Sequence, residues 1–549
     1  MRETRSAAFL ALLFVCALPA FATRFDDIDI TVRNGFGKPK TGHYYEQRLG
    51  VANRSGNAHS VKITLESQMA RGGASRATRT VQIPPHSETV VTLPFLVIGY
   101  YTPNEATVEI DGREQNEKVL LTQLSAWEES TNPDVLLSRS VRYDVQPSSI
   151  DIERPEVAPG EWSTSWIQYD RFAAVAVSAS DWTQLPPAVH DALFRWTFAG
   201  GVLMFVDKPD PMPAVSVRST EGRYGLGRIL VFDDGLFYDS RLSPLLQSRG
   251  NDASFFNTAT GELPLLKDEQ VPLRGLYIGL IVFAIAGGPL SIFLLAKKNR
   301  RMWIFGTLPF FAIVTSVFLI GATFASEGWV KIQRSVTITY LDETLGRATT
   351  LGLTGFYATV SPRGEIRFAP DTELRVNSDY RSPINGDTTW DDGQRLFGGW
   401  VGTRVPTYFA VRKSEPRRER MPLQFSAAGV SGVNGLGGTI EKVWVANGKG
   451  EVFEAKNVAP GAAFTLTRTT ASLPETTSHA AERILDADVR LTILGNIDQH
   501  PRHLLQRGTY LAYVRDAPFH EKAMDNATTM DRRGIVFGVS RLEGGADAR

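Results

Sequence analysis

The sequence predicts a multidomain protein with an immunoglobulin-like β-sandwich, an α/β domain, two transmembrane helices and a mostly-β C-terminal region. Three observations predict this class. Short runs with period-two alternation, separated by turn residues, fill both ends of the chain. An interval between them alternates apolar strands with a helical pattern. Two long uncharged apolar stretches lie near the middle. The 549 residues provide for three or four domains.

The first residues have the parts of a secretory signal peptide. Arg2 and Arg5 precede an apolar core over 7–18, and Ala20-Phe21-Ala22 has the small-x-small form of a cleavage site. We expect 1–22 to be removed; an uncleaved segment would be an anchor that exports the same residues. The single cysteine, Cys16, lies in this segment. The mature chain would therefore lack disulfides, thiolate metal sites and cysteine nucleophiles.

The charge balance argues against a nucleic-acid partner. The chain has 59 acidic and 59 basic residues, so no global field attracts phosphate.

Residues 23–115 predict the immunoglobulin-like β-sandwich. Alternating runs separated by Gly, Asn, Pro and Ser clusters occur at 28–32, 47–52, 61–65 and 89–93. The stretch resembles the immunoglobulin-like modules of bacterial surfaces. Such a module binds partners, spaces domains or acts as a plain scaffold, and the fold by itself carries no chemistry.

Residues 116–260 predict the α/β domain. Pro187 is suited to the first turn of a helix whose Val189, Leu193 and Trp196 share a face. Gly200-Gly201 ends that helix. Apolar strands are predicted at 119–124, 171–178, 202–206 and 228–232.

This domain resembles the class I glutamine-amidotransferase-like fold. The matching residues are Tyr169-Asp170-Arg171-Phe172, Asp181-Trp182, Leu185-Pro186 and the helix that ends Trp196-Thr197-Phe198-Ala199-Gly200-Gly201. In active members of that family a cysteine follows the strand that corresponds to 202–206. This chain has Asp207-Lys208-Pro209-Asp210 there, without the thiol or the glycines of a nucleophile elbow.

The resemblance therefore implies a degenerate domain without catalytic residues. What it leaves open is a ligand cleft at the carboxyl ends of the strands, where open α/β sheets bind ligands. The residues expected near that cleft are Ser178, Ser180, Asp181, Asp207 and Lys208. Each of them can also be read as an ordinary loop residue or helix cap.

The apolar stretches 275–296 and 302–326 predict a transmembrane hairpin. Each is long enough to cross a hydrocarbon core, and four cations occupy the intervening loop 297–301. The loop would stay in the cytoplasm, which places both ends of the chain outside the bacterial inner membrane. The lipid bilayer is then an expected partner. Neither stretch contains an ionisable residue, which argues against a transporter.

This arrangement resembles a group of uncharacterised bacterial membrane proteins that pair an exported amidotransferase-like region with such a hairpin. The matching residues run from Gly288-Pro289 through Pro309 to Gly328, then 336–342 and 355–357. The resemblance implies no particular activity.

Residues 329–549 predict an exported β-rich region of one or two sandwich-like domains. Strand-like runs recur at 336–341, 356–360, 366–369, 440–445, 452–455, 463–466, 489–494, 510–514 and 534–539.

Sequence motifs for catalysis, cofactors and metals are missing. There is no G-x-S-x-G, P-loop or H-E-x-x-H motif. Asp498 with His500 and His503 could share a metal, and the acidic groups at 26–29 and 391–392 could attract calcium, but none has a full ligand spacing. We therefore expect no cofactor and no metal.

The preferred hypothesis is a non-catalytic scaffold of the cell envelope that binds other envelope or membrane proteins. The alternatives are an envelope hydrolase or transferase with a site in the α/β domain, and an accessory subunit of a membrane transport complex.

Overall fold

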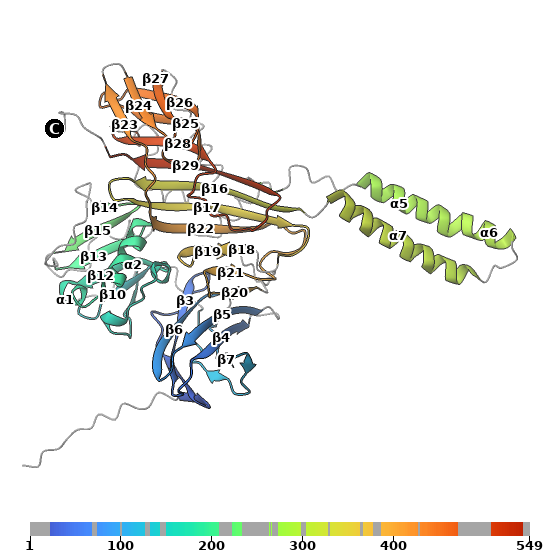
Figure 1. Ribbon diagram of the computed structural model, residues 1–549, viewed down its shortest axis with the longest axis horizontal. Helices are drawn as coiled ribbons and strands as arrows, with labels where there is room; N and C mark the ends of the chain where they lie inside the picture. Colours follow the sequence, from blue (N-terminus) through green and yellow to red (C-terminus); the bar gives the residue numbers. More distant parts are fainter. Residues whose placement is uncertain are drawn as a thin grey trace, which may run out of the picture.

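The computed structural model describes most of the chain, and β-strands dominate it (Figure 1). It describes residues 22–68, 74–98, 101–126, 132–142, 150–207, 222–232, 263, 265, 273–297, 303–327, 330–362, 366–376, 386–426, 429–469, 505 and 507–541. Four sheets and one helical hairpin account for the arrangement of these residues.

An N-terminal sandwich is built from two antiparallel layers. One layer has the order β1-β2-β3-β6, and β5-β4-β7-β8 belong to the other. Ile30, Leu49 and Leu93 of the first layer are fully buried, as are Val61 and Ile63 of the second, because alternate side chains face the space between the layers. The strands are β1 (Ala22–Phe25), β2 (Ile28–Arg33), β3 (Tyr44–Asn53), β4 (His59–Gln68), β5 (Ala74–Ile83), β6 (Ser87–Leu96), β7 (Glu105–Ile110), β8 (Arg113–Glu114) and β9 (Val119–Leu120).

The second layer of this sandwich continues into a distant part of the chain. β20 (Asp387–Thr389) pairs in parallel with β5, and β21 (Gln394–Leu396) and β18 (Ile366–Phe368) extend the sheet. The carboxylate of Asp391 also accepts a hydrogen bond from the backbone N–H of Thr80 at 2.6 Å. The N-terminal sandwich and the C-terminal half therefore share one sheet.

The α/β domain has a parallel sheet at its centre. β10 (Asp134–Leu137), β11 (Asp151–Glu153), β12 (Phe172–Ser178), β13 (Val202–Val206) and β15 (Gly227–Phe232) pair in parallel, and β14 (Arg223–Tyr224) closes one edge. Short helical turns over Pro159–Glu161 and Trp166–Tyr169 precede β12, and α1 (Ala179–Trp182) follows it. α2 (Pro187–Phe198) buries Val189, Leu193 and Trp196. This is the face that the spacing predicts.

A glycine sets how closely α2 approaches the sheet. A Cβ on Gly227 would lie 2.1 Å from the carbonyl oxygen of Thr197 and 2.2 Å from that of Gly201. Only glycine allows the start of β15 to pass this close to the end of α2.

The C-terminal half forms an eleven-stranded sheet in the order β19-β22-β17-β16-β29-β28-β25-β26-β27-β24-β23. At its centre β16 pairs in parallel with β29, the last strand of the described chain. The strands are β16 (Lys331–Asp342), β17 (Arg347–Ala358), β19 (Thr372–Val376), β22 (Thr407–Pro416), β23 (Leu423–Ser426), β24 (Gly429–Val433), β25 (Thr439–Ala446), β26 (Val452–Val458), β27 (Ala463–Arg468), β28 (Thr509–Arg515) and β29 (Thr529–Val539). The strand predicted at 489–494 lies outside the described residues.

A buried ion cluster joins the three parts. The carboxylate of Asp170, from the α/β domain, contacts the guanidinium of Arg412 and lies 2.8 Å from Nη2 of Arg375 and 3.0 Å from Nδ1 of His43. Glu373 pairs with both arginines, at 2.5 and 2.8 Å. The Asp170 and Glu373 side chains are 2% exposed. Burial lowers the pKa of Arg412 to about 9. Burial disfavours each of these charges because it removes them from water. Pairing with opposite charges within the cluster offsets that cost.

Replacing Arg412 by Met should destabilise the protein by about 3–5 kcal/mol, because two buried carboxylates lose a shared cation. Guanidinium unfolding followed by tryptophan fluorescence measures this. Arg468→Ala removes an exposed partner of Glu451 and should cost less than about 1 kcal/mol. Equal effects of the two substitutions would show that the cluster does not hold the parts together.

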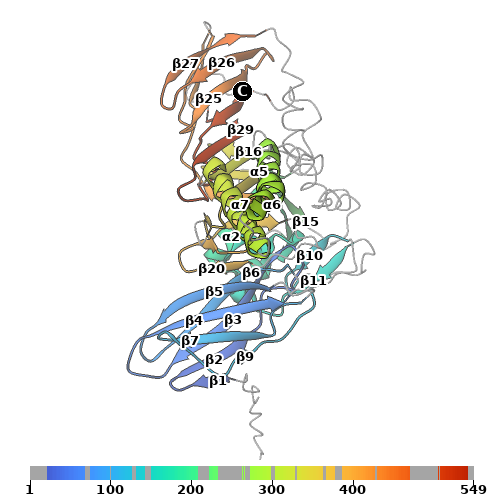
Figure 2. The same cartoon turned by 90° about the vertical axis from the view of Figure 1, so that its right-hand side faces the viewer.

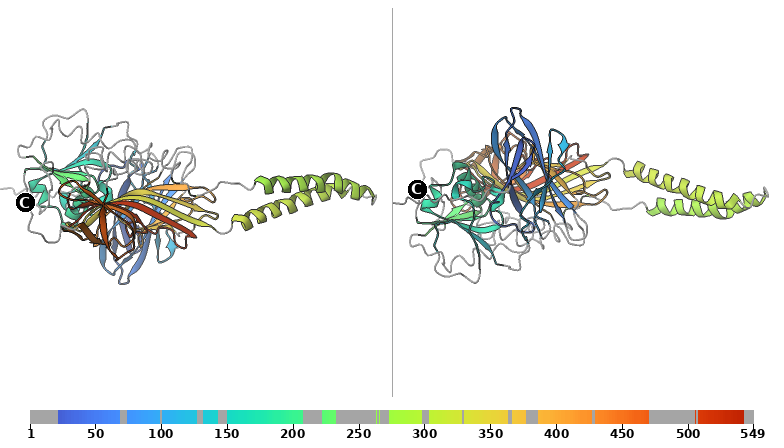
Figure 3. Two further views of the ribbon diagram at one scale, coloured as in Figure 1. Left: turned by 90° about the horizontal axis from the view of Figure 1, so that it is seen from above. Right: turned by 90° about the horizontal axis from the view of Figure 1, so that it is seen from below.

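A helical hairpin projects from one end of the large sheet (Figures 1 and 3). Its first arm consists of α5 (Leu273–Ile285), a π-helical turn over Ala286–Leu290 and α6 (Ser291–Lys297), and its second arm is α7 (Ile304–Glu327). Pro289 lies in the π turn, where it cannot donate a backbone hydrogen bond. The Ser291 hydroxyl donates to the Gly287 carbonyl at 2.5 Å.

The prediction of two transmembrane helices is therefore wrong. The first apolar stretch is divided at Gly287-Gly288-Pro289 into helices of 13 and 7 residues. Within the described residues, no helix has both the length and the apolar character that crossing a membrane requires. The predicted fold class is corrected in this respect, and so is the inner-membrane location with two spans. The remaining cations of the loop lie outside the described residues.

The hairpin nevertheless exposes many large apolar side chains. Phe305 is 82% exposed and Phe318 67%. The others are Tyr277, Leu280, Ile281, Val282, Ile285, Leu290, Ile292, Phe293, Trp303, Phe310, Ile313, Val314 and Val317. A contiguous apolar surface of this kind marks a contact with a partner or a liability for aggregation.

Replacing Phe310, Ile313 and Val317 together by Ser should reduce self-association of the protein in buffer without detergent, because the three exposed side chains lie on one turn-spaced strip of α7. Light scattering at several protein concentrations measures this. The same replacement at the exposed but isolated positions Leu120, Val405 and Val433 is the control, and an equal reduction there would contradict the assignment to the hairpin.

Candidate functional site

Three of the five residues predicted for a cleft lie together at the carboxyl edge of the parallel sheet. Ser178 ends β12 and caps α1, where its hydroxyl accepts a hydrogen bond from the N–H of Asp181 at 3.1 Å. The Ser180 hydroxyl lies 3.0 Å from that of Ser178. This is the arrangement expected of a short helix that begins directly after a strand.

Asp181 is held by the loop that follows the neighbouring strand β10. Its two carboxylate oxygens accept hydrogen bonds from the N–H and the hydroxyl of Ser140, both at 2.8 Å. Burial raises the pKa of Asp181, but hydrogen bonds from Ser138, Ser140 and Ser178 outweigh it and leave the pKa below its ordinary value. Asp181 therefore joins two loops through hydrogen bonds to both of its carboxylate oxygens.

Asp207 lies after the next strand, β13, and is exposed. Its φ is +66°, in the left-handed region, and its N–H donates to the carbonyl of Phe232 at 2.9 Å. Asp207 thus departs from the extended conformation directly after a buried strand, at a φ that aspartate tolerates better than most residues. Lys208 lies outside the described residues.

Sequence reasoning missed Ser138 and Ser140. They follow β10, a four-residue strand that begins directly after Asn132-Pro133 and is too short to show a period. Its fully buried run Asp134–Leu137 is the only local signal for it.

Replacing Asp181 by Asn should destabilise the protein by about 1–3 kcal/mol near neutral pH, because hydrogen bonds to a charged acceptor are lost. A lowered folded-state pKa means that this contribution is present above the unfolded pKa of about 3.9 and is lost as the pH falls through the folded value. Urea unfolding from pH 7 to pH 3 should show the difference between the two proteins shrinking only below about pH 4. A difference that is constant over the whole range would contradict this role; Glu114→Gln, at an exposed position, is the control.

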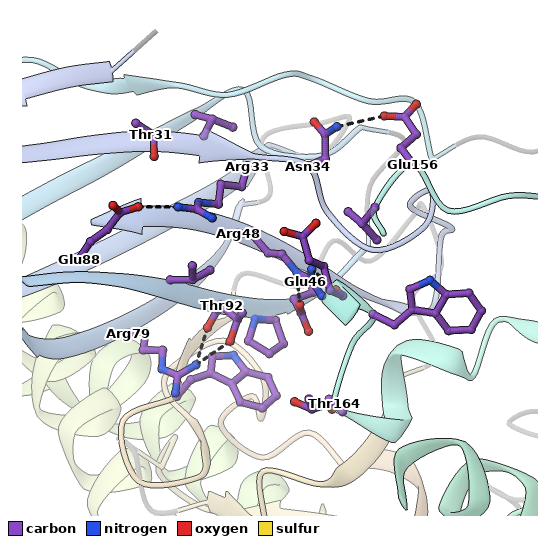
Figure 4. A pocket seen from close by; sticks show the side chains of 18 of the residues that line it. Thr31, Arg33, Asn34, Glu46, Arg48, Arg79, Glu88, Thr92, Glu156 and Thr164 are labelled. Carbon is purple, nitrogen blue, oxygen red and sulfur yellow. Dashed lines mark hydrogen bonds and ion pairs between the residues drawn. The ribbon is translucent and has the colours of Figure 1, made fainter. Parts of the chain in front are cut away.

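A larger site lies where the N-terminal sandwich meets the α/β domain. It is a groove of about 910 Å³, near the upper end of the volumes of ligand pockets (Figure 4). We call it the junction groove. Its floor is the outer face of β2, β3 and β6. The remainder is lined by Asn34, Arg79, Glu156, Val157, Glu161, Trp162, Thr164, Ser165, Pro370 and Trp390. Of the predicted cleft residues that the structure describes (Ser178, Ser180, Asp181 and Asp207), none lines it.

The floor of the junction groove is a polar row across three strands. Arg33 pairs with Arg48 and Arg48 with Thr92 in the register of β2, β3 and β6. Arg33 reaches along the sheet to Glu88, with 2.5 Å between Nη2 and Oε1. Gly50 leaves the space for this, since a Cβ there would lie 2.9 Å from Nε of Arg33.

One wall is fixed to the floor by a buried pair. Nε of Arg48 lies 2.6 Å from Oε1 of Glu46, and Nη1 of Arg48 donates to the backbone carbonyl of Glu161 at 2.5 Å. The Ser163 hydroxyl donates to the second oxygen of Glu46 at 2.8 Å. Trp162 lies between these residues, is 3% exposed and packs on Phe36. The wall over 161–163 is therefore preorganised on the sheet.

The two ends of the junction groove carry different groups. Figure 4 shows Arg79 and Glu156 at opposite ends. Nη1 of Arg79 donates to the carbonyl of Thr92 at 2.5 Å, whereas Glu156 accepts from the Asn34 amide at 3.3 Å. Trp390 lies beside the Arg79 end, because its backbone N–H donates to the carbonyl of Thr78 at 2.9 Å.

The predicted alternatives for metal binding find no support in the structure. Among the described residues no group of three or more His, Asp or Glu side chains could hold a metal ion. Asp29 is paired with Arg24 and Arg54, and Asp392 with Arg367 and Arg395. Asp498, His500 and His503 lie outside the described residues.

Comparison with known proteins identifies no family. No protein-family model matches the chain, and a search of curated proteins finds no match. Solved structures overlap only weakly. The yeast delta-COP-I mu-homology domain is 8% identical with a TM-score of 0.19, over 38% of this chain and 95% of that one. The structural-genomics target SoR45 is 12% identical with a TM-score of 0.14, over 19% and 87%. A Paenibacillus cycloisomaltooligosaccharide glucanotransferase is 12% identical with a TM-score of 0.16, over 32% and 27%. At such scores no fold or function is transferred, and the amidotransferase-like resemblance stays a prediction.

Proposed function

We propose that this protein is a non-catalytic scaffold that binds a segment of another protein in the junction groove. The observation that carries the proposal is that the groove is open and preorganised at the same time. Its wall over 161–163 is bonded to its floor through Arg48 and Glu46, and its volume is large enough for several residues of a partner. A site whose shape is already fixed loses little entropy on binding.

The titratable groups of the groove floor support binding over chemistry. Glu46 and Arg48 are buried and paired with each other, and Glu88 is paired with Arg33. A general acid or base needs a free position within hydrogen-bond reach of the substrate, and a paired, buried carboxylate does not offer one. At the carboxyl edge of the parallel sheet, both carboxylate oxygens of the buried Asp181 are likewise engaged in hydrogen bonds.

The helical hairpin supports a role in partner binding as a second surface. Its exposed side chains, such as Phe305 and Phe318, would be covered in a working assembly, because apolar surface in water is unfavourable. We propose that an apolar partner surface covers them.

The competing function, a hydrolase, draws on one feature. Asp207 holds a left-handed backbone conformation at the carboxyl end of β13, and strained residues cluster at active sites. Among the described residues, the hydrogen bonds at Asp207 supply it with no partner for acid–base chemistry. We therefore place this function second.

Photo-crosslinking tests the scaffold. A photoreactive amino acid at Thr164 or Val90, which line the junction groove, should give discrete covalent products with another protein in the native host cell. The same group at Leu120, which is 78% exposed on the far side of the sandwich, is the matched control. Asp207→Ala should leave the products unchanged. Products of equal yield at all three positions, or none at Thr164 and Val90, would refute the proposal.

A further inference from the structure

The charges of the junction groove are not all balanced internally. Arg33 with Glu88 and Arg48 with Glu46 form ion pairs. Three charged lining residues then remain without an ionic partner among the described residues: Arg79 is bonded to the neutral Thr92, Glu156 only to the neutral amide of Asn34, and the carboxylate of Glu161 to no side chain.

These three residues are separated within the groove. Arg79 lies at one end and Glu156 at the other (Figure 4). Glu161 belongs to the same wall as Glu156, five residues further along the chain, and both are exposed. The groove is therefore dipolar, with the Arg79 guanidinium at the β5 end and the Glu156 carboxylate at the other, while Glu161 adds a second carboxylate on the wall that carries Glu156.

A second observation lies at the donor end. Trp390 is 7% exposed, lines the groove, and its indole Nε1 has no hydrogen-bond partner among the described residues. It also borders a small internal cavity of about 10 Å³ beside Tyr44. Because this nitrogen is itself buried, Trp390 contributes packing and no hydrogen bond to this end of the groove.

The lining excludes two other classes of ligand. Sugars stack on exposed aromatic faces, but Trp162 and Trp390 are both more than nine-tenths buried and pack edge-on or tilted against Phe36 and Tyr44. Nucleic acids present a row of phosphates, and the groove has one more carboxylate than guanidinium.

We propose that the junction groove binds an extended peptide segment that carries a carboxylate at one end and a basic side chain at the other. The carboxylate meets Arg79 at the β5 end, and the basic side chain meets Glu156 and Glu161. This inference rests on the proposed function and names the chemistry of the segment that the scaffold holds.

Synthetic peptides test this directly on the full chain. The probes are four capped, fluorescein-labelled hexapeptides, each about 20 Å long when extended. Two carry Asp and Lys at opposite ends in either order, one carries two Lys, and one is neutral. Fluorescence anisotropy should show one of the Asp/Lys peptides binding at least tenfold more tightly than the neutral peptide and more tightly than the two-Lys peptide.

Substitutions of lining residues test which end of the junction groove binds which charge of the peptide. Glu156→Gln with Glu161→Gln should weaken the preferred peptide at least fivefold and leave the neutral peptide unchanged. Arg79→Gln, which removes the guanidinium, should weaken the preferred peptide about threefold. Glu114→Gln, an exposed carboxylate outside the groove, is the matched control and should change nothing.

Binding of all four peptides within twofold, tighter binding of the two-Lys peptide, or no effect of the paired glutamate substitutions would overturn the inference. A different result would refute the proposed function. Cross-links at Thr164 without any peptide preference would refute only the dipolar ligand, whereas the absence of cross-links would refute the scaffold itself.

Discussion

The buried cluster of Asp170, Glu373, Arg375, Arg412 and His43 is the interaction on which the rest of this structure depends. Its members come from the N-terminal sandwich, the α/β domain and the large C-terminal sheet. Each of them is ion-paired to a member from another part or to a residue that is. Charges in such a place are stable only while all their partners are present, since the cost of desolvation is offset by pairing alone. Geometry across the three parts is thereby fixed.

The junction groove is a consequence of that fixed geometry. Its floor is a sheet face of the sandwich, its wall belongs to the α/β domain, and Trp390 reaches it from a strand segment more than 300 residues away along the chain from β5. Figure 2 shows the sandwich below the other parts and the C-terminal strands above. Because β20 pairs with β5 and Arg48 bonds to the carbonyl of Glu161, neither wall needs a ligand to take its position.

The helical hairpin shows where counting apolar residues is insufficient. Length and lack of charge predict two spans. They do not take into account that the backbone hydrogen bonds change from the α to the π pattern at Gly287-Gly288-Pro289, which divides the first helix. The hairpin still exposes large apolar side chains, and surfaces of this kind are typical of sites that contact a partner.

The sequence by itself determined local features: the period-two runs that lie within β4, β6 and β16, the buried face of α2, and the cap at Ser178. Each depends on residues close together in the chain, whose spacing is visible in one dimension. Only the tertiary structure decided which strands share a sheet, that Asp181 anchors a loop, and that Arg79, Glu156 and Trp390 line one groove. Those features depend on distant pairings, such as Ser140 with Asp181, 41 positions apart, and Arg76 with Asp387, 311 positions apart, and no local pattern encodes such a partner.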